Sequence, residues 1–233
     1  MSASDPRIAI DGEQSVRDLD LLRFMELELY TAVVSDALDE IGYREQVMRE
    51  YLRPIHSLHV FAGWAHTVTC SDIYHIPDNS YDLEIEAVDT VRPGEVMVVS
   101  TQQSKRNAPW GELLSTAAKA RGARGAVVDG LVRDVRKIEE REFPVFAAGI
   151  KPLDSRGRGI VTGYDLPVQC GEVLVNPGDL IFADFDGIVS IPKAVVSDVV
   201  RIASEKVKRE NGSRADLMKG AFLRDVFNKY GVL

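Results

Sequence analysis

The sequence predicts a mixed α/β sandwich, because short apolar strands and helical segments alternate along most of the chain. Runs such as 96–99 and 126–128 are wholly apolar and are bounded by turn residues, as buried strands are. Helical spacing of apolar residues is clearest at 16–25 and 33–41. With 233 residues, of which 45% are hydrophobic, the chain can bury one substantial core. We therefore expect a single domain spanning residues 1–233.

Local signals define the elements of the first half. Residues 1–13 are polar and are expected to form a loose N-terminal segment. Gly42 has the position of a C-capping glycine, and Pro93 and Gly94 make a turn into the next strand. The predicted elements are helices at 16–25, 33–41 and 83–91, an extended segment at 58–70 and a strand at 96–99.

The second half continues the alternation. Pro192 ends the last apolar run, because proline does not continue a central strand. The predicted elements are a helix at 113–121, strands at 126–128, 160–161, 173–175, 180–183 and 188–191, and two closing helices at 195–210 and 216–229.

Composition excludes several classes of protein. A net charge of -8 and a pI of about 5.1 are opposite to the basic footprint of a nucleic-acid-binding protein. No apolar run reaches the roughly eighteen residues of a membrane span, so no membrane partner is expected. Cys70 and Cys170 are far apart, and no secretory leader is recognisable, which predicts buried, reduced thiols in a cytoplasmic protein.

Two segments concentrate the residue types of an anion and metal site. The run Trp110-Gly111-Glu112-Leu113-Leu114 opens a helix with free backbone N–H groups, and its glycine lets a ligand approach closely. About twenty residues later, Arg133 and Asp134 follow a buried strand. Arg133 can bind a carboxylate or an enolate oxygen, and Asp134 and Glu112 can hold a hard divalent cation. The same spacing is also typical of a capped helix followed by a surface ion pair.

With these two segments, five further ones resemble the RraA-like family. They are TAVVSDALD at 31–39, FPVFA at 143–147, NPGD at 176–179, DFDGIV at 184–189 and FNKYGVL at 227–233. The family contains class II 4-hydroxy-4-methyl-2-oxoglutarate / 4-carboxy-4-hydroxy-2-oxoadipate aldolases and the regulator of ribonuclease E activity. The resemblance runs in order over nearly the whole chain. It implies a swivelling β/β/α sandwich assembled as a homotrimer or homohexamer, with active sites between subunits.

The resemblance also implies a reaction and a set of roles. A metal-dependent lyase would cleave a 4-hydroxy-2-oxo acid to pyruvate and a second carbonyl compound, and would decarboxylate oxaloacetate at the same site. The N–H groups of Leu113 and Leu114 would bind the pyruvyl carboxylate, and Arg133 would brace the C2 oxygen. Asp134, with Glu112 acting through a water, would hold Mg²⁺ or Mn²⁺. A metal-activated water would take the proton of the C4 hydroxyl, since no histidine is placed for it.

Three more residues have open roles. Glu210 resembles the glutamate that the aldolases send into a neighbouring subunit's site, and is equally a solvated acid near a helix end. Arg156 and Arg158 lie in a cationic loop that either reaches the substrate's distal carboxylate or is a solvated turn. Glu112 departs from the aspartate of many family aldolases, which puts the native substrate and metal preference in question.

Other functions fit the sequence less well. The glycines between 157 and 163 do not have the spacing or the leading strand of a dinucleotide or S-adenosylmethionine loop. The four histidines, at 56, 59, 66 and 75, match no zinc signature. Lys119 and Lys151 are not embedded in apolar strands, as a Schiff-base lysine would be. A non-catalytic regulator that binds ribonuclease E remains the alternative to the aldolase.

Overall fold

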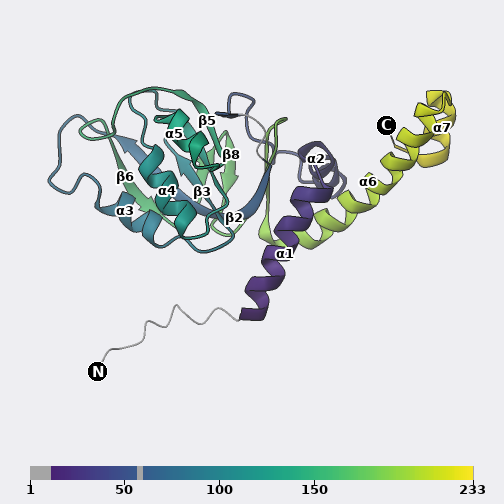
Figure 1. Ribbon diagram of the computed structural model, residues 1–233, viewed down its shortest axis with the longest axis horizontal. Coiled ribbons are helices and arrows are strands. Elements are labelled where there is room, and N and C mark those ends of the chain that lie inside the picture. Colours follow the sequence, from purple (N-terminus) through teal and green to yellow (C-terminus); the bar gives the residue numbers. More distant parts are fainter. Residues whose placement is uncertain (1–11, 57–59, 233) are drawn as a thin grey trace.

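The computed structural model describes residues 12–56 and 60–232 and has the expected mixed α/β architecture (Figure 1). The predicted loose segment 1–13 lies almost wholly outside these residues, as does His59. Helix α1 (Gly12–Glu28) nevertheless starts at Gly12, four residues before the start expected from apolar spacing.

An eight-stranded mixed sheet forms the centre of the described structure. Its order is β1-β5-β4-β3-β2-β9-β10, and β6 pairs with β2 beside that path, while β7 and β8 form a separate hairpin. The strands are β1 (Arg53–Pro54), β2 (Phe61–Asp72), β3 (Glu95–Ser100), β4 (Gly125–Val132), β5 (Val145–Ile150), β6 (Gly159–Tyr164), β7 (Val168–Cys170), β8 (Val173–Val175), β9 (Leu180–Ala183) and β10 (Ile188–Ile191).

Strand β2 connects two parts of this sheet. Residues 61–64 pair antiparallel with β9, whereas residues 68–72 pair antiparallel with β6. On its other edge β2 runs parallel to β3, which is followed by the parallel strands β4 and β5. Because the strands β2 to β5 are parallel, their carboxyl ends share one edge of the sheet, where ligand sites of α/β proteins form.

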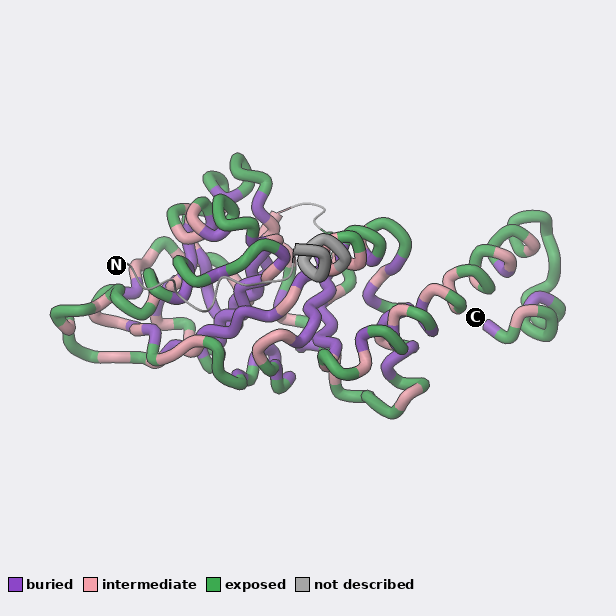
Figure 2. The backbone as a smooth tube through the Cα atoms, turned by 90° about the horizontal axis from the view of Figure 1, so that it is seen from below, coloured by how far each residue is buried: buried purple, intermediate pink, exposed green. Residues whose placement is uncertain are grey.

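Three apolar clusters cover the sheet and its extension. Helices α3 (Asp82–Asp89), α4 (Glu112–Ala120) and α5 (Val135–Glu140) pack on one face, where they bury side chains of β3 and β4. The β7–β8 hairpin packs on the opposite face around Phe61 and Phe146. Helices α1, α2 (Thr31–Glu40) and α6 (Val196–Met218) pack against β9 and β10. Figure 2 shows the buried backbone concentrated in the central strands.

The closing helices differ from the prediction. Helix α6 continues through residues 211–215, where a break was expected, and the turn before α7 (Leu223–Tyr230) lies at 219–222. Gly212 is a packing position: a Cβ there would lie 2.6 Å from Cε1 of Tyr230. Gly220, with a φ of +89°, makes the turn instead.

Two other sequence expectations are confirmed, the strand at 160–161 and the buried thiols. Residues 159–164 form strand β6, which contains Gly159 and Gly163, whereas Gly157, with a φ of 71°, lies in the turn before it. Cys70 and Cys170 are both buried free thiols. None of the helices within the described ranges is long and apolar enough to cross a membrane.

Candidate active site

The candidate site lies where β4 ends and α4 begins. Trp110 and Val132 form a parallel bridge, and the N–H of Arg133 donates to the carbonyl of Trp110 at 2.9 Å. Trp110 is itself fixed in the core, where its Nε1 donates to Oγ of Ser115 at 2.9 Å. These contacts place the start of α4 next to the residues that follow β4. The two sequence segments are thus brought together as predicted.

Gly111 allows the closest approach in the site. A Cβ at this position would lie 2.7 Å from Oδ2 of Asp134 and 3.1 Å from Cγ of Arg133. Asp134 has a φ of 59°, in the left-handed region that aspartate tolerates better than most residues. Its carbonyl accepts hydrogen bonds from the N–H groups of Lys137 and Ile138, and these are the first hydrogen bonds of α5. The backbone therefore holds the Asp134 side chain beside the start of α4.

The first turn of α4 has the donors of an anion site. The first bond of the helix runs from the N–H of Ser115 to the carbonyl of Gly111 at 3.1 Å, so the N–H groups of residues 112–114 precede the helical ladder. The backbone N–H of Glu112 donates to Oδ2 of Asp134 at 3.4 Å. The N–H groups of Leu113 and Leu114 lie at the positive end of the helix dipole, as the sequence predicts.

Arg133 is oriented by an acid that was not predicted. Its Nη2 lies 3.1 Å from Oδ1 of Asp154, while its Nε is 3.6 Å from Oδ2 of Asp134. Tyr81 donates to the other oxygen of Asp154 at 2.8 Å. Burial raises the pKa of Asp154. Hydrogen bonds from Tyr81 and from the backbone N–H of Arg156, together with the positive charge of Arg133, lower it by more, so the pKa of Asp154 is lowered overall. Asp154 is an ionised partner that orients the guanidinium.

A cleft of about 320 Å³ contains these groups. Its walls combine one cation, Arg133, with four acids and an apolar rim, and are made by Tyr81, Glu84, Ile85, Pro109, Gly111, Glu112, Leu113, Leu114, Arg133, Asp134, Asp154 and Ser155. Glu84 on α3 was not predicted. Burial and the charge of Asp154 raise the pKa of Glu84 to about 7, and Arg133 opposes this rise. The sequence signal that could have pointed to Glu84 is an acid placed between two apolar residues, at 83 and 85, in a predicted helix.

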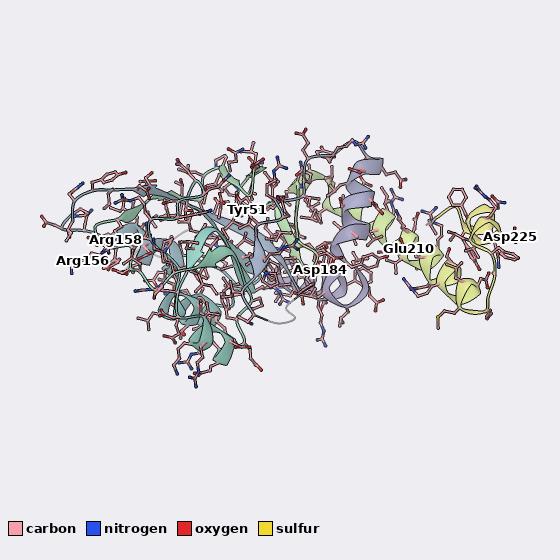
Figure 3. The ribbon with its side chains drawn as sticks, turned by 90° about the horizontal axis from the view of Figure 1, so that it is seen from above. Tyr51, Arg156, Arg158, Asp184, Glu210 and Asp225 are labelled. Carbon is pink, nitrogen blue, oxygen red and sulfur yellow. The ribbon has the colours of Figure 1, made fainter. Side chains whose placement is uncertain are left out.

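Three of the predicted site residues lie outside the cleft. Arg156 and Arg158 lie at the end of the molecule remote from Glu210, as Figure 3 shows. Nη1 of Arg158 donates to the carbonyls of Asp154 and Arg156, and the side chain of Arg156 is exposed. Glu210 lies on α6 and lines a separate pocket of about 660 Å³ near α7. Within one chain, none of the three lines the cleft with Arg133.

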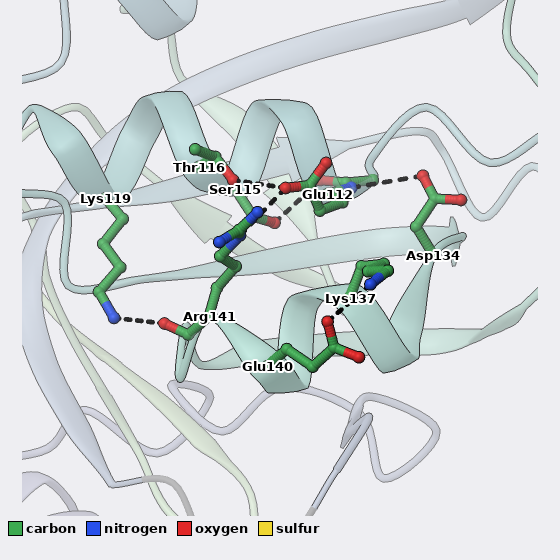
Figure 4. A network of polar contacts seen from close by, with 9 residues as sticks. Glu112, Ser115, Thr116, Lys119, Asp134, Lys137, Glu140 and Arg141 are labelled. Atoms are coloured by element: carbon green, nitrogen blue, oxygen red, sulfur yellow. Dashed lines mark hydrogen bonds and ion pairs between the residues drawn. The ribbon is translucent and has the colours of Figure 1, made fainter.

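The carboxylate of Glu112 is engaged away from Asp134 (Figure 4). Oε1 of Glu112 accepts a hydrogen bond from Thr116 at 2.9 Å and one from Nε of Arg141 at 3.1 Å. The hydrogen bonds from Thr116 and Arg141 lower its pKa. In this arrangement Glu112 ties α4 to the residue that follows α5. Its water-mediated metal role stays a prediction.

The donor set fits a hard, hydrated cation better than an enclosed metal. Among the described residues, no three His, Cys, Asp or Glu side chains converge to enclose a metal ion. Asp134 has a side-chain exposure of 46% and presents its carboxylate to the cleft. Mg²⁺ commonly binds through one or two carboxylates, retained waters and substrate oxygens. Asp134 can serve as the protein ligand of such an ion.

The rival chemistries gain no support from the geometry. Nζ of Lys119 donates to the carbonyl of Arg141, and Nζ of Lys151 donates to that of Lys105 at 2.8 Å, so both lysines are surface cations on backbone acceptors. His66 is buried, with Nδ1 3.3 Å from Oδ1 of Asp165 and 3.6 Å from Oε2 of Glu95. It lines a different pocket from Arg133.

The site combines a helix N-terminus, an arginine and an acid at the carboxyl end of the parallel strands, an arrangement that suits the binding of small anions. The chain belongs to the RraA-like (Aldolase/RraA) family, whose model matches residues 31–190. The match includes both site segments. The RraA-type fold expected from the sequence is confirmed.

The proteins to which this chain is similar include two sequence relatives and one of known structure. A Halalkalibacterium halodurans protein named "Putative 4-hydroxy-4-methyl-2-oxoglutarate aldolase" is 32% identical over 176 residues, covering 76% of this chain and 79% of that protein. An uncharacterized protein of Methanocaldococcus jannaschii is 39% identical over 122 residues, which are 52% of this chain and 58% of that protein. The crystal structure of Streptomyces coelicolor RraAS2, an unusual member of the RNase ES inhibitor RraA protein family, matches with a TM-score of 0.72 and 28% identity, covering 85% of this chain and 96% of that one.

Proposed function

We propose that this protein is a divalent-metal-dependent, pyruvate-forming aldolase that cleaves a 4-hydroxy-2-oxo acid and also decarboxylates oxaloacetate. The observation that carries the proposal is the convergence of Arg133 and Asp134 on the N-terminus of α4, with Gly111 permitting the contact. The aldolase name of the Halalkalibacterium halodurans relative supports the same reaction class.

The chain's own groups suit the binding and charge stabilisation that this reaction requires. The N–H groups of Leu113 and Leu114 would bind the substrate carboxylate at the positive end of α4. Arg133, oriented by Asp154, would donate to the C2 oxygen, where negative charge develops as the C3–C4 bond breaks. Asp134, with Glu112 through a water, would hold Mg²⁺ or Mn²⁺, which supplies Lewis-acid polarisation of the C2 carbonyl when bound.

A coupled assay tests this function. Purified protein is given 4-hydroxy-4-methyl-2-oxoglutarate or oxaloacetate with Mg²⁺ or Mn²⁺, and pyruvate is followed with lactate dehydrogenase. We expect pyruvate from both compounds, loss of activity with a chelator, and recovery on adding metal. Borohydride in the presence of pyruvate should add no mass to the protein. A lysine adduct would instead establish Schiff-base chemistry.

A second candidate function is regulation of ribonuclease E by protein contact. It is favoured by the similarity to Streptomyces coelicolor RraAS2. The two functions separate experimentally, because a regulator would bind ribonuclease E at micromolar concentration and would release no metal-dependent pyruvate from either compound.

We also infer a homotrimer or homohexamer with the active site shared between subunits, located in the cytoplasm. Helices α6 and α7 extend away from the sheet (Figure 1), and Met218 and Phe222 there are 84% and 79% exposed. Apolar surface of this kind favours a subunit contact. Glu210 would reach a neighbouring cleft from α6, in a ring that closes by rotation. The free thiols of Cys70 and Cys170 support the cytoplasmic location.

The shared site has a complementation test. Light scattering should give the mass of three or six chains, and Glu210→Ala should lose most activity without changing that mass. Mixing Glu210→Ala with Arg133→Ala subunits under exchanging conditions should restore part of the activity. A fully active monomer, or mixed rings that stay inactive after proven exchange, would contradict it.

A further inference from the structure

We propose that Glu84 is the acid–base residue of the cleft, taking the proton of the substrate's C4 hydroxyl and returning it to C3 of the pyruvate enolate. This role rests on the proposed aldolase function. It replaces the metal-activated water expected from the sequence with a side chain of this protein.

Glu84 occupies the inner wall of the cleft. It lines the same cleft as Arg133, Asp134 and the start of α4. It also borders the apolar interior beneath α3, where Trp110 and Leu114 contribute to the wall. A substrate held by the α4 N-terminus and Arg133 would therefore lie against Glu84.

The charged and titratable groups around Glu84 come from several elements. Asp154 and Arg133 act on it across the cleft, and Tyr81 stands at the start of its own helix. From β2, the buried thiol of Cys70 and the carboxylate of Asp72 line cavities that Glu84 also lines. In the described part of the chain, α4 contributes apolar Leu114 and the acid Glu112, and β6 contributes apolar Val161. The pKa of Glu84, raised to about 7 by burial first and Asp154 second, makes both protonation states available near neutral pH.

Glu84 also lines a small polar cavity. Its lining includes Ser71, Ser80, Ser104 and Asn107 as well as Glu84, and its volume of about 10 Å³ is room for about one water molecule. Asn107 is 5% exposed, and its Oδ1 is buried without a hydrogen-bond partner. A single water there would donate to Oδ1 of Asn107, in a cavity that the Glu84 side chain also lines.

The proton transfers balance without an added oxidant or reductant. The carboxylate of Glu84 removes the C4 hydroxyl proton, C4 becomes a carbonyl carbon, and the C3–C4 electron pair forms the enolate of pyruvate. Protonated Glu84 then gives the same proton to C3, which yields the methyl group of pyruvate and restores the carboxylate. Oxaloacetate needs no hydroxyl deprotonation, because its C3–C4 bond breaks with loss of carbon dioxide.

This difference gives the test. In Glu84→Gln, kcat for aldol cleavage should fall by about 10²-fold or more, whereas oxaloacetate decarboxylation should fall by less than about tenfold. Exchange of the pyruvate methyl protons with D₂O, followed by NMR, should be lost. Glu84→Asp should recover part of the cleavage activity. Asp82→Asn, an exposed acid-to-amide change on the same helix, should leave all three rates unchanged.

Each other outcome decides against the role. Equal loss of cleavage and decarboxylation in a folded Glu84→Gln protein would mean that Glu84 only shapes the cleft. Cleavage at the wild-type rate, or methyl exchange that persists, would remove Glu84 from the proton path. A wild-type protein with neither activity would overturn the aldolase itself, and the role of Glu84 with it.

Discussion

Oδ2 of Asp134 lies 2.7 Å from the point that a Cβ at Gly111 would occupy. That separation is shorter than any normal carbon–oxygen contact, so a side chain at position 111 would displace the acid or the helix start. Gly111 has extended backbone angles, φ -153° and ψ -166°, which other residues also adopt. The glycine is therefore required for space around Asp134 and Arg133, and not for its backbone conformation.

Replacing this glycine should damage the site more than the fold. Gly111→Ala should lower kcat/KM for pyruvate release at least tenfold, because small displacements of reacting groups are costly. The loss of stability should be near 1 kcal/mol, the low end for an added methyl group, because the Asp134 side chain can move into solvent. Gly187→Ala is the matched control, since a methyl group added there would meet nothing within 4 Å. Equal activities of the two variants would disprove the spatial role.

The planar guanidinium of Arg133 should be essential. Arg133→Lys keeps the charge and can keep the ion pair with Asp154, but it loses the planar set of donors that would bind Asp154 and the C2 oxygen together. Activity should fall by a factor on the order of a hundred or more. Arg136→Lys, at a position 90% exposed, provides the control and should retain full activity. Kinetics of the two purified variants, with melting temperatures, separate a catalytic loss from unfolding.

Metal affinity should depend on Asp134 far more than on Glu112. Asp134→Ala should weaken Mn²⁺ binding by more than about tenfold, because it removes the carboxylate that would bind the ion directly. Glu112→Gln should weaken it less, since the Glu112 carboxylate is already bound by Arg141 and Thr116. Calorimetric titration with Mn²⁺ measures both. The reverse order would assign the principal ligand to Glu112.

Aldol cleavage should depend on pH through Glu84. Its pKa is raised to about 7, so the carboxylate that accepts the C4 proton is lost as pH falls through 7. Wild-type kcat for cleavage should then drop about tenfold per pH unit below 7 and reach a plateau above it. The small residual activity of Glu84→Gln should lack this transition. An identical pH profile in both proteins would assign the titration to another group.

Much of the fold was predictable because its signals are local. The apolar runs in β3, β4, β9 and β10 are bounded by turn residues, and each is a strand at the predicted place. Strand β5 was not assigned, although Pro144 and Pro152 flank its run at 145–150; it forms by long-range pairing with β4 and β1. The break in the closing helices was misplaced at 211–215. Gly212 there serves contact with Tyr230, which only tertiary structure reveals.

The candidate site likewise contains residues that the sequence predicted and residues that it did not. Gly111, Arg133 and Asp134 were predictable because they lie in short segments that carry their own chemistry. Glu84 and Asp154 come from α3 and from the loop before β6, and their proximity to Arg133 results from chain packing that spacing does not encode. The engagement of Glu112 by Arg141 likewise depends on where α5 ends.

The most direct test of the proposed site is a crystal structure of the protein with Mn²⁺ and oxalate, a mimic of the pyruvate enolate. We expect an anomalous manganese peak at coordination distance from a carboxylate oxygen of Asp134. One oxalate carboxylate should lie on the N–H groups of Leu113 and Leu114, and an oxygen of the other should lie within hydrogen-bond distance of Arg133. Manganese and oxalate bound together at any other place in the molecule would contradict it.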